Sequence, residues 1–218
     1  ISNNGPATSN GGAGIYTSSD SDLALVIANN VIHANDGVGI RVSNASTTIS
    51  ANTITDNVGG AIRAGDINSA ETFNFTISNN TFSGNSAVDG SVLHLSNNLT
   101  VEYNTFQNNT GSNLIHPTGS SPYPTINQNN FMANAVTYYV LNYQADSDPD
   151  IDLQNNWWGT IDQATIQTKI YDWTDDGTKQ VVDYTPFLTA PDTTAPPSPP
   201  ANVVAQTSPT TTYDQDVM

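Results

Sequence analysis

The stretch Ile77-Ser78-Asn79-Asn80-Thr81-Phe82-Ser83-Gly84-Asn85 decides the fold, because its pattern recurs along the chain. The pattern is an apolar residue, two variable residues and Asn, then one variable residue, an apolar residue, two variable residues and a second Asn. Four more full copies start at Ile27, Ile49, Val101 and Ile126, and partial copies start at Ile1 and Leu153. Units of this length predict a stacked repeat, because one unit is too small to bury its own apolar face.

The central Asn of each copy predicts a corner between strands. Within a unit the apolar residues alternate or form short runs, which is typical of strands, and no helical period runs through residues 1–156. An Asn side chain can bond to the backbone of a turn and to the equivalent Asn one coil away, and Asn tolerates left-handed backbone. We therefore expect a ladder formed by Asn30, Asn52, Asn80, Asn104, Asn129 and Asn156, with Asn4 of the first partial copy at the same position.

The copies resemble the right-handed parallel β-helix repeats of the pectate-lyase-like superfamily over about residues 1–188. The resemblance implies an all-β fold: a right-handed parallel β-helix, or β-solenoid, of about seven coils. It implies little about chemistry, because that superfamily includes lyases, hydrolases, epimerases, adhesins and non-catalytic surface modules.

The chain divides into three parts. We expect β-helix coils over residues 1–160, a C-terminal cap over 161–189 and an extended Pro-rich tail over 190–218. The cap begins after Asn155-Asn156-Trp157-Trp158-Gly159, a sequence that resembles the end of many bacterial and archaeal surface β-helix domains. Thr160-x-x-Gln163 looks like a capping box, and the apolar spacing that follows predicts a short helix and then a closing strand near 181–188. The expected cap core contains Trp157, Trp158 and Trp173.

The tail has two interpretations. Residues 191–200 form a stiff Pro-rich linker, and residues 201–205 resemble the first strand of an immunoglobulin-like module. Alternatively, the tail adds as a strand to the next copy of the chain, which would build a head-to-tail filament.

A column of polar residues is the main functional signal. A short strand follows each corner, and if Ile15, Ile40, Ile62, Leu93 and Ile115 point inward, the next residue of each strand points outward. The sequence thus predicts a strip, stacked at about 4.8 Å per coil, of Tyr16, Arg41, Arg63, His94 and His116. Such a strip suits an extended anionic or sugar ligand, although the same stacking could arise by chance on exposed strands.

Two further kinds of site, a calcium site and a polysaccharide-active site, have less support in the sequence. Asp146, Asp148, Asp150 and Asp152 could converge on Ca²⁺, the one cofactor that the sequence suggests, or form a solvated acidic loop. A polysaccharide-active enzyme would need paired carboxylates beside the strip, and the candidates Asp36, Asp66 and Asp89 are dispersed at corners. The sequence therefore identifies no catalytic residue.

The composition of the chain argues against some classes of binding partner. The net charge is −16, from 20 acidic and 4 basic residues, which argues against nucleic acid and anionic membranes as partners. No membrane span is present in the sequence, and the absence of Cys excludes disulfides and thiolate metal sites. We expect an extracellular or cell-surface module that is structural, adhesive or glycan-binding and leans away from catalysis. The alternatives are a filament subunit, whose partner is a copy of itself, and a polysaccharide-active enzyme.

Overall fold

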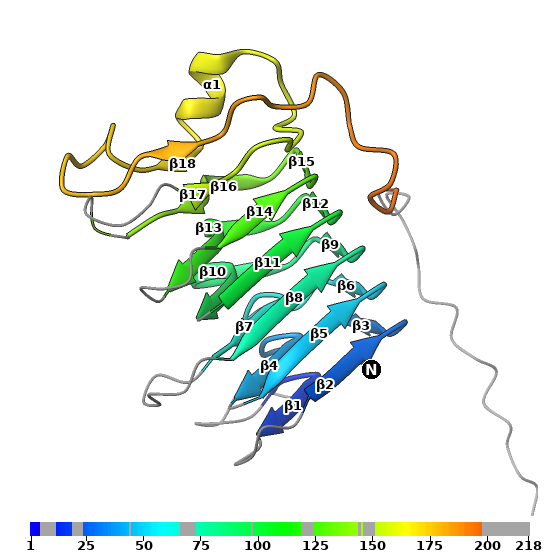
Figure 1. The fold of residues 1–218 in the computed structure, drawn as a ribbon. Helices are drawn as coiled ribbons and strands as arrows, with labels where there is room; N and C mark the ends of the chain where they lie inside the picture. Colours follow the sequence, from blue (N-terminus) through cyan, green and yellow to red (C-terminus); the bar gives the residue numbers. More distant parts are fainter. Residues whose placement is uncertain are drawn as a thin grey trace, which may run out of the picture.

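The computed structural model describes residues 1–4, 12–18, 24–43, 45–65, 73–96, 98–118, 124–143, 145 and 151–197. These residues form an all-β parallel solenoid in which three sheets enclose one elongated core, with almost no helix (Figure 1). Every pair of named strands that hydrogen bonds does so in parallel, with neighbours from successive repeats rather than from adjacent segments of the chain. The chain therefore winds from sheet to sheet and stacks one repeat on the last.

The first sheet contains the short strand that follows each corner. Its seven strands are ordered β1 (Ile15–Ser18), β4 (Ile40–Ser43), β7 (Ile62–Ala64), β10 (Ser86–Ser96), β13 (Thr110–Thr118), β16 (Ala135–Leu141) and β18 (Ile170–Tyr171).

The second sheet contains the strand that precedes each central Asn. It also has seven strands, in the order β19 (Val182–Asp183), β17 (Ile151–Asp152), β14 (Thr125–Asn127), β11 (Asn98–Glu102), β8 (Asn74–Ser78), β5 (Ser46–Ser50) and β2 (Ala24–Ala28).

The third sheet contains the short segment between the two Asn residues of each repeat. Its five strands are β15 (Asn130–Met132), β12 (Thr105–Gln107), β9 (Thr81–Ser83), β6 (Thr53–Thr55) and β3 (Val31–His33). Beyond these strands the partial copies contribute only single bridges, Ser2 to His33 and Asn130 to Trp157. The third sheet thus has five strands in the described part of the chain, fewer than the seven coils expected from the repeats.

The core is a set of columns, because residues at equivalent positions stack in register. In the third sheet, Ile32 pairs with Ile54, and Phe82, Phe106 and Phe131 continue the same column. All five are fully buried, and the ring centroids of Phe82 and Phe106 lie 4.8 Å apart. Burial of each such side chain contributes about 1.5–3 kcal/mol, so the column holds neighbouring coils together.

The expected Asn ladder runs through the corner between the second and third sheets. The Asn52 side chain accepts hydrogen bonds from the backbone and side-chain amides of Asn30, at 2.9 and 3.1 Å. The same pair of bonds links each ladder residue to the next, through Asn80, Asn104, Asn129 and Asn156. From Asn52 onward the ladder residues are essentially buried. Each side-chain amide also donates to a carbonyl of the preceding coil, so the buried polar atoms are satisfied.

A second Asn ladder runs beside the first and corrects the prediction for Asn4. The second Asn of each repeat forms a parallel column, Asn35, Asn57, Asn85, Asn109 and Asn134, with the same bonding. Asn4 joins this second ladder by donating to Asn35 at 2.9 Å, so its expected alignment with Asn30 is wrong. The left-handed residue is the one before the ladder Asn, such as Ala51 with φ 53°. The pair of hydrogen bonds between successive ladder Asn residues holds the backbone in this left-handed conformation. Residues other than Asn can therefore occupy the position before the ladder Asn.

The C-terminal segment differs from the predicted helix. Helix α1 spans only Gln163–Gln167, and its N-cap is Asp162, which accepts from the backbone N–H of Thr165, rather than Thr160. Ile170 lies in β18, where it pairs with Val140, so the helical spacing from Ile166 to Ile170 was coincidental.

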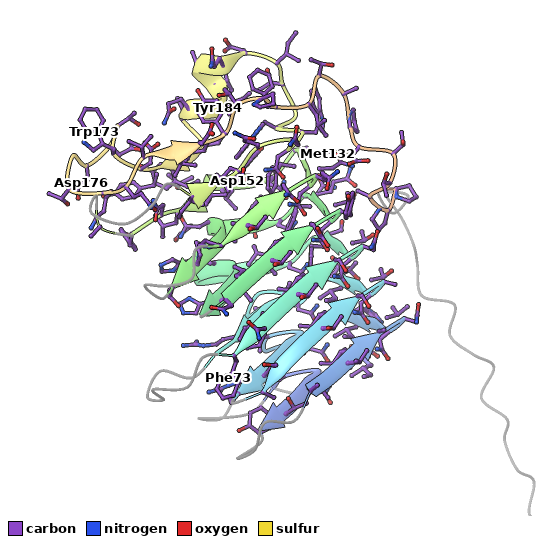
Figure 2. The ribbon with its side chains drawn as sticks, viewed as in Figure 1. Phe73, Met132, Asp152, Trp173, Asp176 and Tyr184 are labelled. Carbon is purple, nitrogen blue, oxygen red and sulfur yellow. The ribbon has the colours of Figure 1, made fainter. Side chains whose placement is uncertain are left out.

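Trp158 is 2% exposed and packs against Phe131, with ring centroids 5.0 Å apart and planes tilted by 38°, whereas Trp157 is half-buried. Trp173 is 50% exposed and lies in the outer loop with Asp176, so its expected place in a cap core is wrong (Figure 2).

The described part of the tail lies against the third sheet. The Asn130 side chain donates to the carbonyl of Asp192 at 2.9 Å and accepts from its N–H at 2.7 Å. The Thr105 hydroxyl donates to the carbonyl of Pro196, and Ala195 is 4% exposed. Residues 191–197 are therefore held on the strands β15 and β12 of their own chain. The remaining tail predictions, for residues 198–218, lie outside the described residues.

Candidate ligand-binding strip

The five residues of the strip stack in register on the first sheet. Tyr16 pairs with Arg41, Arg41 with Arg63, and Arg63 with His94. His94 pairs in turn with His116, so one column crosses β1, β4, β7, β10 and β13. The residues before them point inward, because Ile40, Ile62, Leu93 and Ile115 are at most 1% exposed. Alternation across each strand thus places both arginines of the chain and two of its three histidines on one face.

Neighbouring side chains of the strip contact one another. The Arg41 guanidinium carbon lies 5.8 Å from the ring centroid of Tyr16, within the range of a cation–π interaction. The rings of His94 and His116 meet edge to face, with centroids 5.1 Å apart and planes at 85°. Tyr16 and Arg63 are exposed, whereas Arg41, His94 and His116 are half-buried.

Aromatic residues that the sequence did not indicate extend the strip at its C-terminal end. Tyr143 lies 5.4 Å from His116, and Tyr171 lies 5.4 Å from Tyr143, both edge to face. Tyr138 contacts Tyr171 at 5.3 Å, and the Lys179 ammonium lies 5.4 Å from the Tyr143 ring. We call Tyr138, Tyr143 and Tyr171 the aromatic group.

The alternation pattern did not predict the aromatic group, because the column of strip residues changes at β16. Ile115 pairs with Val140, so the position opposite His116 falls to Leu141, which is 7% exposed. Leu141 pairs with Tyr171, and Tyr143 reaches His116 from beyond the end of β16. The alternation rule, applied from the inward residue Val140, therefore points to Leu141 and does not reach Tyr143. The signal that could have found the group is the concentration of Tyr between residues 138 and 171.

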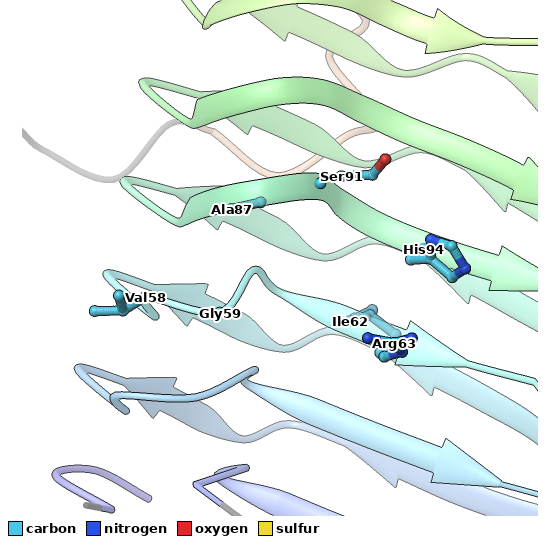
Figure 3. A pocket seen from close by; sticks show the side chains of 8 residues that line it. Val58, Gly59, Ile62, Arg63, Ala87, Ser91 and His94 are labelled. Atoms are coloured by element: carbon cyan, nitrogen blue, oxygen red, sulfur yellow. The ribbon is translucent and has the colours of Figure 1, made fainter. Parts of the chain in front are cut away.

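A shallow hollow of about 440 Å³ opens beside the centre of the strip. Arg63 and His94 lie at one side of it, with His94 above Arg63 on the adjacent strand. Ala87 lies above Gly59 at the other side, and Ser91 lies between Ala87 and His94 on β10 (Figure 3). The pairing of β10 with β13 has a register shift between Ala87 and Ser91, and both of these residues line the hollow. The hollow offers one guanidinium, one imidazole and one hydroxyl to a ligand.

Both histidines of the strip have a lowered pKa. Burial lowers the pKa of His94, and the positive charge of Arg63 lowers it further. Burial and the neighbouring His94 lower the pKa of His116 to about 4. At neutral pH the charge of the strip therefore comes from its arginines, on a chain whose net charge is −16.

Of the other predicted site residues, the structure describes the side chains of only two, Asp36 and Asp152. Asp146, Asp148 and Asp150 lie outside the described residues, and Asp152 is exposed on β17, where it accepts from the N–H of Gln154. Asp36 is exposed, whereas Asp66 and the side chain of Asp89 lie outside the described part. Within the described ranges, no group of three or more His, Cys, Asp or Glu could hold a metal ion. No helix among the same residues is long and apolar enough to cross a bilayer.

Comparison with known proteins supports the fold. A model of the right-handed β-helix region family matches residues 2–72. No curated protein and no solved structure matches the chain significantly. The matched segment includes β1 to β7, and with them the first three residues of the strip.

Proposed function

We propose that this right-handed β-helix repeat protein is a non-catalytic extracellular module that binds an extended anionic glycan along the strip. The observation that carries the proposal is the register of Arg41, Arg63, His94 and His116 on adjacent strands. On a chain with 20 acidic and 4 basic residues, this column places both arginines side by side on one face. Such a face attracts an anion that the rest of the surface repels.

The geometry suits a linear ligand. Four steps of about 4.8 Å separate Tyr16 from His116, so the strip is about 19 Å long. Each Arg side chain can donate two parallel hydrogen bonds to a carboxylate or sulfate. The aromatic group continues the same line and offers ring faces and hydroxyl groups to a sugar. A polysaccharide with repeated acidic groups has the matching shape and charge.

The composition of the hollow favours binding over hydrolysis. Glycoside hydrolysis commonly needs two carboxyl groups, on opposite sides of the bond that breaks. The described residues that line the hollow are Val58, Gly59, Ile62, Arg63, Ala87, Gly90, Ser91 and His94, and none has a carboxylate. A polysaccharide-active enzyme is therefore the less favoured alternative.

Three finer predictions belong to the same proposal. The extracellular location rests on the acidic, Asn- and Thr-rich composition. The pectate-lyase-like subtype rests on the repeat pattern alone. A capping role for residues 161–189 rests on α1 at the end of the stack (Figure 1), on β18 and β19 as the last strands of their sheets, and on Ile166, which is fully buried. The filament alternative is less favoured, because residues 191–197 contact their own chain.

The test is binding of polygalacturonate and dextran sulfate, with neutral dextran as the ligand control. Loss of a charge-assisted contact costs about 1.5–3 kcal/mol, so Arg63→Gln is expected to weaken binding by roughly ten- to a hundredfold. Lys169→Gln is the matched control, because it removes one positive charge from a side chain that bonds to the Val136 carbonyl. Equal losses in the two variants, or no binding of either anionic glycan, would overturn the proposal.

A further inference from the structure

We propose that anion binding at the strip is coupled to proton uptake by the His94–His116 pair, so that acidification strengthens it. The inference rests on the proposed function and concerns the regulation of the same site. Its basis is the position of the pair between the arginines and the aromatic group.

The pair occupies the centre of the extended strip. His94 on β10 pairs with Arg63 on β7 and with His116 on β13. The His94 and His116 rings are 5.1 Å apart, and Tyr143 covers the far side of His116 at 5.4 Å. His94 also lines the hollow with Arg63 and Ser91. An anion that follows the strip must therefore pass both imidazoles.

The surroundings of the pair favour the neutral imidazoles when the site is free. Arg63 faces His94 from one side and His116 faces it from the other, and His116 in turn faces His94 and the Tyr143 ring. The charge of Arg63 lowers the pKa of His94, and His94 lowers that of His116, in each case in addition to burial. A second positive charge in this row is costly without an anion beside it.

A bound anion reverses this balance. Its charge favours the protonated imidazoles, and protonation adds two cationic donors to the two arginines of the column. Any group that holds its proton more tightly in the complex makes affinity depend on pH. Binding strengthens as the pH falls below the histidine pKa in the complex, and each unit by which binding raises that pKa gives a tenfold gain once the pH is also below the pKa of the free site. The site therefore binds weakly at neutral pH and more tightly near pH 5.

The experiment uses dextran sulfate, because its sulfate groups keep their charge throughout this pH range. The dissociation constant is measured by calorimetry at pH 7 and at pH 5, for the parent and for the double variant His94→Gln, His116→Gln. The matched control is His33→Gln, which removes the third histidine, a residue of β3 in the third sheet. Calorimetry of the parent in two buffers of different ionisation enthalpy counts the protons that are taken up.

We expect the parent to bind about tenfold or more tightly at pH 5, with net proton uptake. The double variant should lose most of this gain, compared with its own affinity at pH 7, and His33→Gln should show the same gain as the parent. Equal parent affinity at both pH values without proton uptake overturns the coupling and leaves glycan binding standing. A double variant that keeps the gain at pH 5 also overturns the coupling and leaves glycan binding standing. No binding at either pH overturns both proposals. If the double variant does not fold, the proton count of the parent decides.

Discussion

Replacement of Asn104 by alanine tests whether the ladders stabilise the solenoid. The Asn104 side chain is fully buried and makes five hydrogen bonds. Its oxygen accepts from the backbone and side chain of Asn80, and its amide donates to Ile77, Glu102 and Asn129, all at 2.8–3.0 Å. Alanine removes these bonds and leaves the backbone N–H of Asn80 buried without this acceptor.

The expected loss follows from the unpaired groups. A buried donor without a partner costs about 1–3 kcal/mol, and each lost bond a further net 0.5–1.5 kcal/mol, with incomplete additivity. Asn104→Ala should therefore lower the free energy of unfolding by about 3–5 kcal/mol, a large part of a typical domain's stability. Urea unfolding followed by circular dichroism measures it, with an unchanged m value as the sign of an unchanged transition.

The control is Thr100→Ala, a half-buried outward position on β11 in the same coil, which should cost less than about 0.5 kcal/mol. A loss below about 1 kcal/mol for Asn104→Ala, or one equal to that of the control, would refute the structural role of the ladder.

Two further predictions concern the tail and the strip. Asn130→Ala removes both bonds to Asp192, so proteinase K should cleave residues 191–197 several times faster than in the parent, and an unchanged rate would show that Asn130 does not hold the tail. The pKa of His116 in the folded chain is about 4, below its ordinary value of 6.5. Between these pH values the unfolded chain binds more protons than the folded chain, so the free energy of unfolding decreases as the pH falls from about 6.5 to 4. After allowance for the exposure of the ring, His116→Gln should reduce this loss by on the order of 1 kcal/mol in urea unfolding at pH 7 and 4.5, and an identical acid loss in the variant would contradict the assignment.

The strand columns and the first ladder could be predicted because they depend on local rules. Alternation across a strand needs only the identity of one inward residue, and Leu93 was enough to place His94 outward. The corner Asn repeats at every coil, so its partner one coil away follows from the stacking alone. Neither inference needed the path of the chain between repeats.

The errors arose where two patterns looked alike. Both halves of the motif contain an apolar residue three positions before Asn, so Asn4 could not be assigned to one ladder by its sequence. Ile166 and Ile170 fit a helix, but pairing of Ile170 with Val140 ends the helical segment. Tyr143 joins the site by reaching across from another strand end, a contact that depends on tertiary structure.

The two ladders divide each repeat into a fixed part and a variable part. Asn57 follows Thr48 by nine positions, and the same step separates Thr76 from Asn85, Thr100 from Asn109 and Thr125 from Asn134. Successive ladder residues are nevertheless 22 to 28 positions apart. All variation in repeat length therefore falls outside this ten-residue segment, on the two sides of the strip. Segments next to the strip can be lengthened or exchanged one coil at a time while the ladders keep the register, which makes this face the natural place to engineer new ligand contacts.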